Sequence, residues 1–314
     1  MIETLYLIKP RGFCAGVVRA IDIVERALAI YGAPIYVRKE IVHNPIVVAD
    51  LRAKGAVFVE HLDEVPEEGV VIFSAHGVAP DVYADADRRS LNVIDATCPL
   101  VTKVHLEARR YAKEGRTILL IGHEGHDEVI GTMGEAPDQI ILVEDEEDID
   151  RLAGLDPTNV AFLTQTTLSV DDTRQIIDTI RERYPEVKAP TKEDICYATQ
   201  NRQEAVKAIA AKVDLLLVVG GANSSNSLRL VEVARQNGVR AYRIDRASEI
   251  EPAWLEGARA AAITAGASTP EHLVQEVADV FRSLGVKRVE EFQTVPENVV
   301  FPLPRQLEQV NSQG

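Results

Sequence analysis

The sequence has three cysteines, Cys14, Cys98 and Cys196, whose thiols could do chemistry together. Their odd number and wide spacing do not fit a disulfide framework, and a reducing compartment would keep them as thiols. Each cysteine opens a segment in which apolar residues recur every three or four positions, the period of a helix. Backbone N–H groups and the dipole at a helix N-terminus stabilise a thiolate. Three thiols at equivalent positions therefore indicate a metal or cluster site.

Two kinds of metal site suit three thiolates. They could bind zinc together with a histidine, or bind three irons of a 4Fe-4S cluster whose fourth iron stays open. The sequence has no CxxC pair, so the usual signal of a structural zinc site is missing. Cys14 does not fit a phosphatase nucleophile, because Ala20 stands where a C-x5-R loop requires arginine. The cysteines favour the cluster, with catalytic zinc as the alternative.

Polar residues that could bind a small anion follow the strand-like apolar runs. His43, His76 and His126 end such runs, as do the sequences GGANSSNS and GASTP. Taken alone, each histidine more often satisfies a local hydrogen bond, and each small-residue run reads as an ordinary loop. Between a strand and a helix, however, such loops offer hydroxyl, amide and backbone N–H donors to a phosphate or diphosphate.

One carboxylate, Glu128, lies two residues after His126 and could carry a proton. Its position fits equally well an acidic residue at the start of a helix, where it interacts favourably with the helix dipole.

One pattern of elements occurs three times along the chain. After each cysteine come a helix, a strand, a short helix that ends near glycine, and two more strands separated by an acidic connector. Alternating strands and helices predict an α/β fold of three similar lobes, with mostly parallel sheets around a pseudo-threefold axis. We place the lobes at residues 14–97, 98–195 and 196–290, with residues 1–13 and 291–314 as a terminal strand and arm.

Ligands of open α/β sheets bind beyond the carboxyl ends of the strands. Two such ends in each repeat carry the unusual polar residues described above. Three repeats that face one axis would bring six loops and all three cysteines to a central cleft.

Composition excludes several classes of protein. The 314 residues are 46% hydrophobic, enough for a large core and two or three domains. The 34 Lys and Arg against 49 Asp and Glu give a net charge of -15, which opposes general binding to nucleic acid or anionic lipid. No stretch approaches the ~18 apolar residues of a membrane span, and the first residues lack a secretory pattern. We therefore expect a cytoplasmic protein that binds neither membrane nor nucleic acid.

Nine motifs occur in order: PRGFCAGVVRAI, EIVHNP, FSAHGV, DATCPLV, GHEGH, TQTTLSVDDT, ICYATQNRQ, GGANSSNS and TAGASTPE. From about residue 8 to the final FPLP, the chain closely resembles the 4-hydroxy-3-methylbut-2-enyl diphosphate reductases of the non-mevalonate isoprenoid pathway. The resemblance implies three α/β lobes and a central 4Fe-4S cluster. It also implies reductive dehydroxylation of the substrate to isopentenyl and dimethylallyl diphosphate, with two electrons and protons and the substrate hydroxyl at the open iron.

The resemblance also assigns roles to individual residues. The cluster ligands fall on Cys14, Cys98 and Cys196, and the catalytic residues on Glu128, His126 and Thr166, with Thr167 as an alternative to Thr166. The substrate-binding residues fall on His43, His76, His126, Thr166, Ser224, Ser225, Asn226 and Ser268. Asp127 stands where family members commonly have proline, which frees the backbone and adds a charge beside Glu128.

Electrons must come from a partner, because no GxGxxG follows a strand and no flavin site is evident. The resemblance implies a ferredoxin or flavodoxin, whose acidic surface would need a local cluster of Lys or Arg on this acidic chain. Two other functions fit the three thiolates: a zinc hydrolase or lyase acting on a small phosphoester, and a non-enzymatic iron-sulfur redox sensor.

Overall fold

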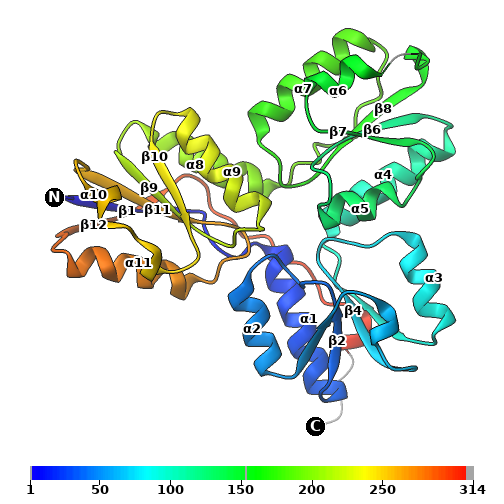
Figure 1. The fold of residues 1–314 in the computed structure, drawn as a ribbon, viewed down its shortest axis with the longest axis horizontal. Helices are drawn as coiled ribbons and strands as arrows, with labels where there is room; N and C mark the ends of the chain where they lie inside the picture. Colours follow the sequence, from blue (N-terminus) through cyan, green and yellow to red (C-terminus); the bar gives the residue numbers. More distant parts are fainter. Residues whose placement is uncertain (1, 153, 309–314) are drawn as a thin grey trace. The chain divides into compact units, whose positions relative to one another are not determined.

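Three parallel sheets form the framework of the protein (Figure 1). The computed structural model describes residues 2–152 and 154–308. Within these residues, the paired strands of each sheet run parallel. The predicted α/β class with three parallel-sheet lobes is therefore confirmed. No described helix is both long and apolar enough to traverse a lipid bilayer.

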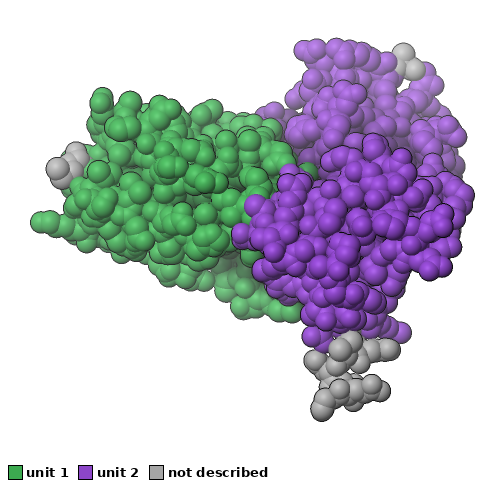
Figure 2. All heavy atoms as spheres, turned by 60° about the horizontal axis from the view of Figure 1, so that its bottom comes forward, with its two compact units in different colours: residues 1–17, 43–47, 197–300 green, residues 18–42, 48–196, 301–314 purple. Residues whose placement is uncertain are grey.

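Compact packing divides the chain into two units, which Figure 2 shows in different colours. Unit 1 comprises residues 1–17, 43–47 and 197–300, and unit 2 comprises residues 18–42, 48–196 and 301–314. The predicted lobe boundaries at residues 98 and 196 stay a prediction.

Unit 1 contains a five-stranded sheet in the order β10-β9-β11-β1-β12. Its strands are β1 (Thr4–Lys9), β9 (Leu215–Val219), β10 (Arg240–Ile244), β11 (Ala260–Ala265) and β12 (Arg288–Gln293). Helices α8 (Tyr197–Ala210) and α9 (Ser225–Gln236) cover one face, and α11 (Glu271–Ser283) covers the other (Figure 1). Side chains of a strand alternate between faces, so Leu217 packs towards α11 whereas Leu216 and Val218 pack towards α8 and α9. Between β10 and β11 lie η3 (Ala247–Glu249) and α10 (Pro252–Leu255).

Unit 2 contains the other two sheets. The first has the order β3-β2-β4-β5, with β2 (Ile35–Arg38), β3 (Ala56–Val59), β4 (Val70–Phe73) and β5 (Asn92–Asp95). Helix α3 (Pro80–Arg88) and the short η1 (Leu62–Glu64) pack on one face through Ala86 and Leu62. Helices α1 (Ala15–Tyr31) and α2 (Pro45–Ala53) each begin in unit 1 and continue into unit 2.

The second sheet of unit 2 has the order β7-β6-β8, with β6 (Thr117–Ile121), β7 (Ile140–Val143) and β8 (Val160–Thr164). Helices α4 (Pro99–Lys113) and α5 (Asp127–Met133) cover the face that bears Ile118 and Leu120. Helices α6 (Glu146–Arg151) and α7 (Val170–Arg183) cover the face that bears Leu119 and Ile121, and η2 (Pro157–Asn159) precedes β8. This sheet is thus buried on both faces, which explains its continuous apolar strands.

The first and last segments that the structure describes are both built into the fold. The N-terminal strand β1 pairs with β11 on one side and β12 on the other. After β12 the chain is irregular up to α12 (Arg305–Glu308). In unit 2, Arg19 Nε donates to the Pro302 carbonyl at 2.8 Å, and Leu307 is fully buried. Residues 309–314 of the predicted arm lie outside the described residues.

Candidate functional site

Each predicted cysteine directly precedes a helix, as the sequence pattern requires: Cys14 precedes α1, Cys98 precedes α4 and Cys196 precedes α8. All three are half-buried, and none forms a disulfide within the described part of the chain. Their side chains therefore lie at helix N-termini, where a thiolate is favoured.

One backbone hydrogen bond recurs at all three cysteines. Cys98 N donates to Ala75 O at 3.0 Å, and Cys196 N donates to Thr166 O at 3.0 Å, both within unit 2. Within unit 1, Cys14 N donates to Ala267 O at 3.1 Å. Each acceptor lies two residues beyond the end of the third strand of a repeat, namely β4, β8 or β11. These bonds hold the backbone of each cysteine beside the carboxyl end of a strand, where ligands of α/β sheets bind.

Glu128 and Thr166 form a buried pair in unit 2. Thr166 Oγ1 donates to Glu128 Oε2 at 2.9 Å, and the Thr166 N–H donates to Oε1 at 2.6 Å. Burial raises the pKa of Glu128 to about 7, although the two hydrogen bonds from Thr166 act in the opposite direction. Thr167 Oγ1 instead accepts a hydrogen bond from Gln165 Nε2 at 2.9 Å. The geometry therefore pairs Glu128 with Thr166, and near neutral pH the carboxyl can hold or release a proton.

His126 and His76 lie beside this pair. His126 is the N-cap of α5, where its Nδ1 accepts a hydrogen bond from the Glu128 N–H at 3.1 Å. The rings of His76 and His126 meet edge to face, with their centroids 5.9 Å apart. His76 lies one residue after Ala75, the acceptor for Cys98. Unit 2 thus connects Cys98, both histidines, the Glu128–Thr166 pair and Cys196 through neighbouring loops.

Asp127, the predicted departure from the family pattern, is paired with a lysine. Its carboxylate forms an ion pair with Lys39 Nζ, and both side chains are partly buried. Lys39 has a positive φ of 59°, which non-glycine residues seldom adopt, and this conformation places it beside α5. The charge added next to Glu128 is therefore balanced locally, and Asp127 is not among the groups that shift the pKa of Glu128.

The predicted residues of unit 1 form a second network. Asn226 Oδ1 accepts from the Ala267 N–H at 2.9 Å, and Ser268 Oγ donates to the His43 carbonyl at 3.0 Å. Ser224 is the N-cap of α9 and accepts from Ser227 Oγ at 3.0 Å. Ser224, Ser225, Asn226 and Ser268 are all buried. Because Ala267 also accepts from Cys14, the network connects Cys14, His43 and the N-terminus of α9.

Two acids that the sequence did not mark as functional stabilise the cysteine loops. Asp95 accepts from Thr97 N and from Tyr83 Oη, both at 2.8 Å. Asp194 accepts from Thr164 N at 3.0 Å and from the Lys103 ammonium at 2.8 Å. A signal for both was present, since an acid stands shortly before the cysteine in DATC and in DIC.

Comparison with known proteins decides which family has this arrangement. The model of the LytB protein family matches residues 5–282. The chain belongs to the LytB family. The resemblance inferred from the nine motifs is thereby confirmed.

Curated relatives support the LytB assignment over nearly the whole chain. The 4-hydroxy-3-methylbut-2-enyl diphosphate reductase of Hahella chejuensis is 58% identical over 305 residues, covering 96% of this chain and 96% of the relative. The protein of the same name from Azoarcus sp. is 57% identical and covers 97% of this chain and 98% of its own length.

Solved structures agree with the LytB fold. The E-1-hydroxy-2-methyl-but-2-enyl-4-diphosphate reductase of Plasmodium falciparum has a TM-score of 0.95 and 40% sequence identity, covering 98% of this chain and 97% of that one. A structure of (E)-4-hydroxy-3-methyl-but-2-enyl diphosphate reductase, described as the terminal enzyme of the non-mevalonate pathway, has a TM-score of 0.64 and 33% identity. It covers 90% of this chain and 100% of that one.

Proposed function

We propose that this chain reduces 4-hydroxy-3-methylbut-2-enyl diphosphate to isopentenyl and dimethylallyl diphosphate, the activity that its relatives' names indicate. The reaction breaks the allylic C–O bond, consumes two electrons and two protons, and releases water. The observation that carries the proposal is the buried Glu128–Thr166 pair, because removal of a hydroxyl group as water requires a proton donor.

Glu128 and Thr166 are suited to pass that proton. When Glu128 carries the proton, the hydrogen bond at 2.9 Å reverses, and the carboxyl donates to Thr166 Oγ1. The hydroxyl hydrogen of Thr166 can then turn towards the substrate. Thr166 thus accepts a proton from Glu128 while it donates its own proton to the substrate. A pKa of about 7 suits this exchange, because neither protonation state is strongly disfavoured at neutral pH.

The diphosphate of the substrate would bind hydroxyl, amide and imidazole groups. The proposal assigns it to His43, His76, His126, Ser224, Ser225, Asn226 and Ser268. The first turn of α9 adds backbone N–H groups and the positive end of a helix dipole. The net charge of -15 would repel an anionic substrate. The backbone dipoles of this site would supply the local attraction that binds the diphosphate.

Cys14, Cys98 and Cys196 would hold a 4Fe-4S cluster. The donor set fits the group, since Fe–S clusters are bound by cysteine thiolates and all three thiols lie at helix N-termini outside any disulfide. When bound, the cluster would supply electrons one at a time and a Lewis-acidic iron position. The chain itself would anchor the diphosphate, orient the hydroxyl and deliver the proton.

Anaerobic metal analysis and turnover test the proposal. The purified protein should be brown, contain roughly four irons per chain and little zinc, and reduce the allylic diphosphate with a reduced dye. Serine replacement at any of the three cysteines should remove most of the iron. A zinc-containing protein that hydrolyses phosphoesters without a reductant would support the zinc alternative. Full iron content without turnover would favour a redox sensor.

We infer further that the electrons come from a small acidic carrier, a ferredoxin or flavodoxin. We also place the protein in the cytoplasm, because three thiol ligands require a reducing compartment. Turnover with the purified carrier in place of the dye tests the first inference. Cell fractionation tests the second.

A further inference from the structure

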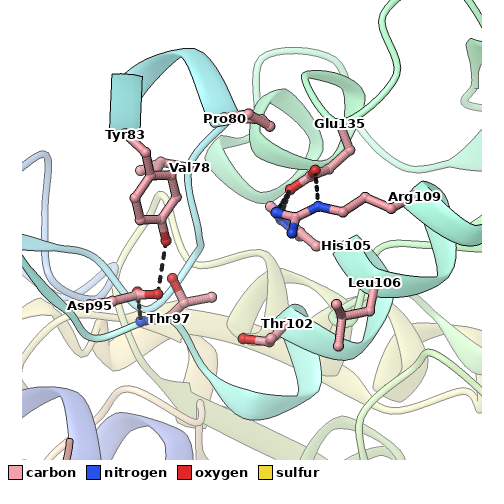
Figure 3. Close-up of a pocket in the computed structure, with 10 residues that line it drawn as sticks. All are labelled: Val78, Pro80, Tyr83, Asp95, Thr97, Thr102, His105, Leu106, Arg109 and Glu135. Carbon is pink, nitrogen blue, oxygen red and sulfur yellow. Dashed lines mark hydrogen bonds and ion pairs between the residues drawn. The ribbon is translucent and has the colours of Figure 1, made fainter. Parts of the chain in front are cut away.

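A buried histidine–glutamate pair lies in unit 2, outside the set of residues assigned above. His105, on α4, is 6% exposed, and its Nδ1 lies 2.7 Å from Glu135 Oε1. The Glu135 side chain is only 1% exposed and also accepts hydrogen bonds from Arg109 (Figure 3). Burial acts to raise the pKa of Glu135, but the bonds from His105 and Arg109 outweigh it and lower the pKa. Since Glu135 follows the end of α5, its carboxylate joins α5 to α4.

The other edge of the His105 ring lies against two glycines. A Cβ on Gly77 would lie 3.0 Å from His105 Nε2, and a Cβ on Gly131 would lie 3.3 Å from His105 Cε1. That Cβ on Gly131 would also lie 3.3 Å from the carbonyl oxygen of Gly77. Gly77 has a φ of +79°, which disfavours any side chain there. Loop 74–79, α5 and the His105 ring therefore meet at a three-way contact that tolerates little added volume.

Packing alone does not keep the His105 ring in this place. A cavity of about 630 Å³ lies beside it, lined among others by His105, Arg109 and Tyr83 (Figure 3). The ring could rotate towards this space if the bond to Glu135 were absent. Within the described residues, Nε2 has no hydrogen-bond partner, so the bond at Nδ1 is the polar contact that fixes the ring.

The three-way contact involves the two segments that carry the histidines of unit 2. His76 immediately precedes Gly77, and His126 caps α5, the helix that contains Gly131. A shift of loop 74–79 relative to α5 would change the 5.9 Å separation of the two imidazole rings. It would also move Glu128, which lies in the first turn of α5.

We propose that His105 and Glu135 are positioning residues for the substrate site. The Glu135 carboxylate holds the His105 ring against Gly77 and Gly131, and the ring sets the separation of His76 and His126. Neither residue touches the substrate. The proposal rests on the proposed function only in identifying the ligand of the two histidines as a diphosphate.

Variants of the pair, studied in the iron-loaded protein, test this positioning role. His105→Phe replaces the imidazole with a larger ring that forms no hydrogen bond, and Glu135→Leu removes the acceptor while the imidazole of His105 stays in place. Both should fold, yet bind inorganic pyrophosphate about tenfold more weakly by calorimetry, which corresponds to ~1.4 kcal/mol. Crystal structures of the variants should show a changed separation of the His76 and His126 rings. Glu135→Gln keeps a carbonyl acceptor and should recover much of the lost affinity.

A matched control and a clear contrary result complete the test. His272→Phe replaces an exposed histidine on α11 and should leave pyrophosphate affinity unchanged. The proposal is wrong if His105→Phe and Glu135→Leu lose only unfolding free energy while affinity and ring separation stay at their wild-type values. It is also wrong if Glu135→Gln and Glu135→Leu behave alike. If the proposed reductase activity is absent from the wild-type protein, the ring separation in the variants still decides the positioning role.

Discussion

Burial raises the pKa of Glu128 to about 7, so the carboxyl is only partly protonated at neutral pH. If Glu128 is the proton donor, kcat should fall as pH rises above about 7, because the donor then loses its proton. Glu128→Gln should retain its iron content and lose roughly 100-fold or more in kcat. A pH profile of kcat for both proteins checks this. Near-wild-type turnover by the variant would remove Glu128 from the proton path.

The same residue links stability to pH. The ordinary pKa of 4.5 applies in the unfolded chain, whereas the native carboxyl keeps its proton up to about pH 7. Between these two pH values the native state therefore binds more protons than the unfolded state. The stabilisation that this bound proton gives the native state is lost as pH rises through 7. We expect the unfolding free energy of Glu128→Gln, taken relative to wild type, to be about 3 kcal/mol higher at pH 8 than at pH 4.5. Urea unfolding at several pH values measures the difference, and a pH-independent difference would contradict the assignment.

The two neighbouring threonines provide a matched comparison. Thr166 Oγ1 donates to Glu128, whereas Thr167 Oγ1 accepts from Gln165. Thr166→Val should therefore reduce kcat by about 10- to 100-fold, since it breaks the proton relay while preserving shape. Thr167→Val should change kcat far less. Steady-state kinetics of both variants measures this, and equal losses would contradict the relay through Thr166.

At the scale of elements, the segment after β12 neutralises a buried charge in unit 1. Arg202 on α8 is fully buried and donates to Gly12 O at 2.7 Å and to Glu297 Oε1 at 3.0 Å. Gly12 lies two residues before Cys14. The irregular C-terminal segment therefore takes part in holding the loop that presents the first thiol.

Removing the carboxylate of Glu297, which neutralises the buried Arg202, should destabilise the protein. Glu297→Gln leaves the guanidinium buried without a paired carboxylate, and we expect a loss of about 3 kcal/mol in unfolding free energy. Glu290→Gln is the control, because its pairing with Arg288 is exposed and should contribute less than ~1 kcal/mol. Denaturant titration of both variants gives the comparison. Equal stability of the two would show that Arg202 does not depend on Glu297.

At the scale of the whole molecule, the net charge of -15 creates repulsion within the folded state. Salt screens such repulsion over about 10 Å at 0.1 M. We expect unfolding free energy near pH 7.5 to rise by roughly 1 kcal/mol from low salt to ~0.2 M KCl. The same titration at pH 5.0, close to the pI, should show little dependence on salt. A fall in stability with salt at pH 7.5 would instead mean that attractive ion pairs dominate.

Much of the fold follows from local sequence. The helices predicted after Cys14, Cys98 and Cys196 match α1, α4 and α8, and the strands predicted after these helices match β2, β6 and β9. Helical periodicity, apolar strands and glycine after helices are encoded within some ten residues, so they can be read directly. Strand β5 has no counterpart in the predicted repeat, because its four residues, NVID, give too weak a pattern.

Residue types alone also determined the kind of chemistry. Three thiols before helices favoured a cluster over catalytic zinc, polar residues at strand ends indicated a small anion, and the nine motifs led to the family. Sequence spacing did not, however, choose between Thr166 and Thr167 as the neighbour of Glu128, nor between a dipole-stabilising and a proton-carrying role for that acid.

Tertiary structure decided what depends on contacts between distant segments. Glu128 is buried only in the folded protein, which raises its pKa, and its hydrogen-bond partner Thr166 lies 38 residues away in the sequence. The bonds from Cys14 to Ala267 and from Arg202 to Glu297, and the insertion of β1 between β11 and β12, join residues far apart in sequence. Such contacts carry no local signal, because they form only when the folded core brings their partners within hydrogen-bonding distance.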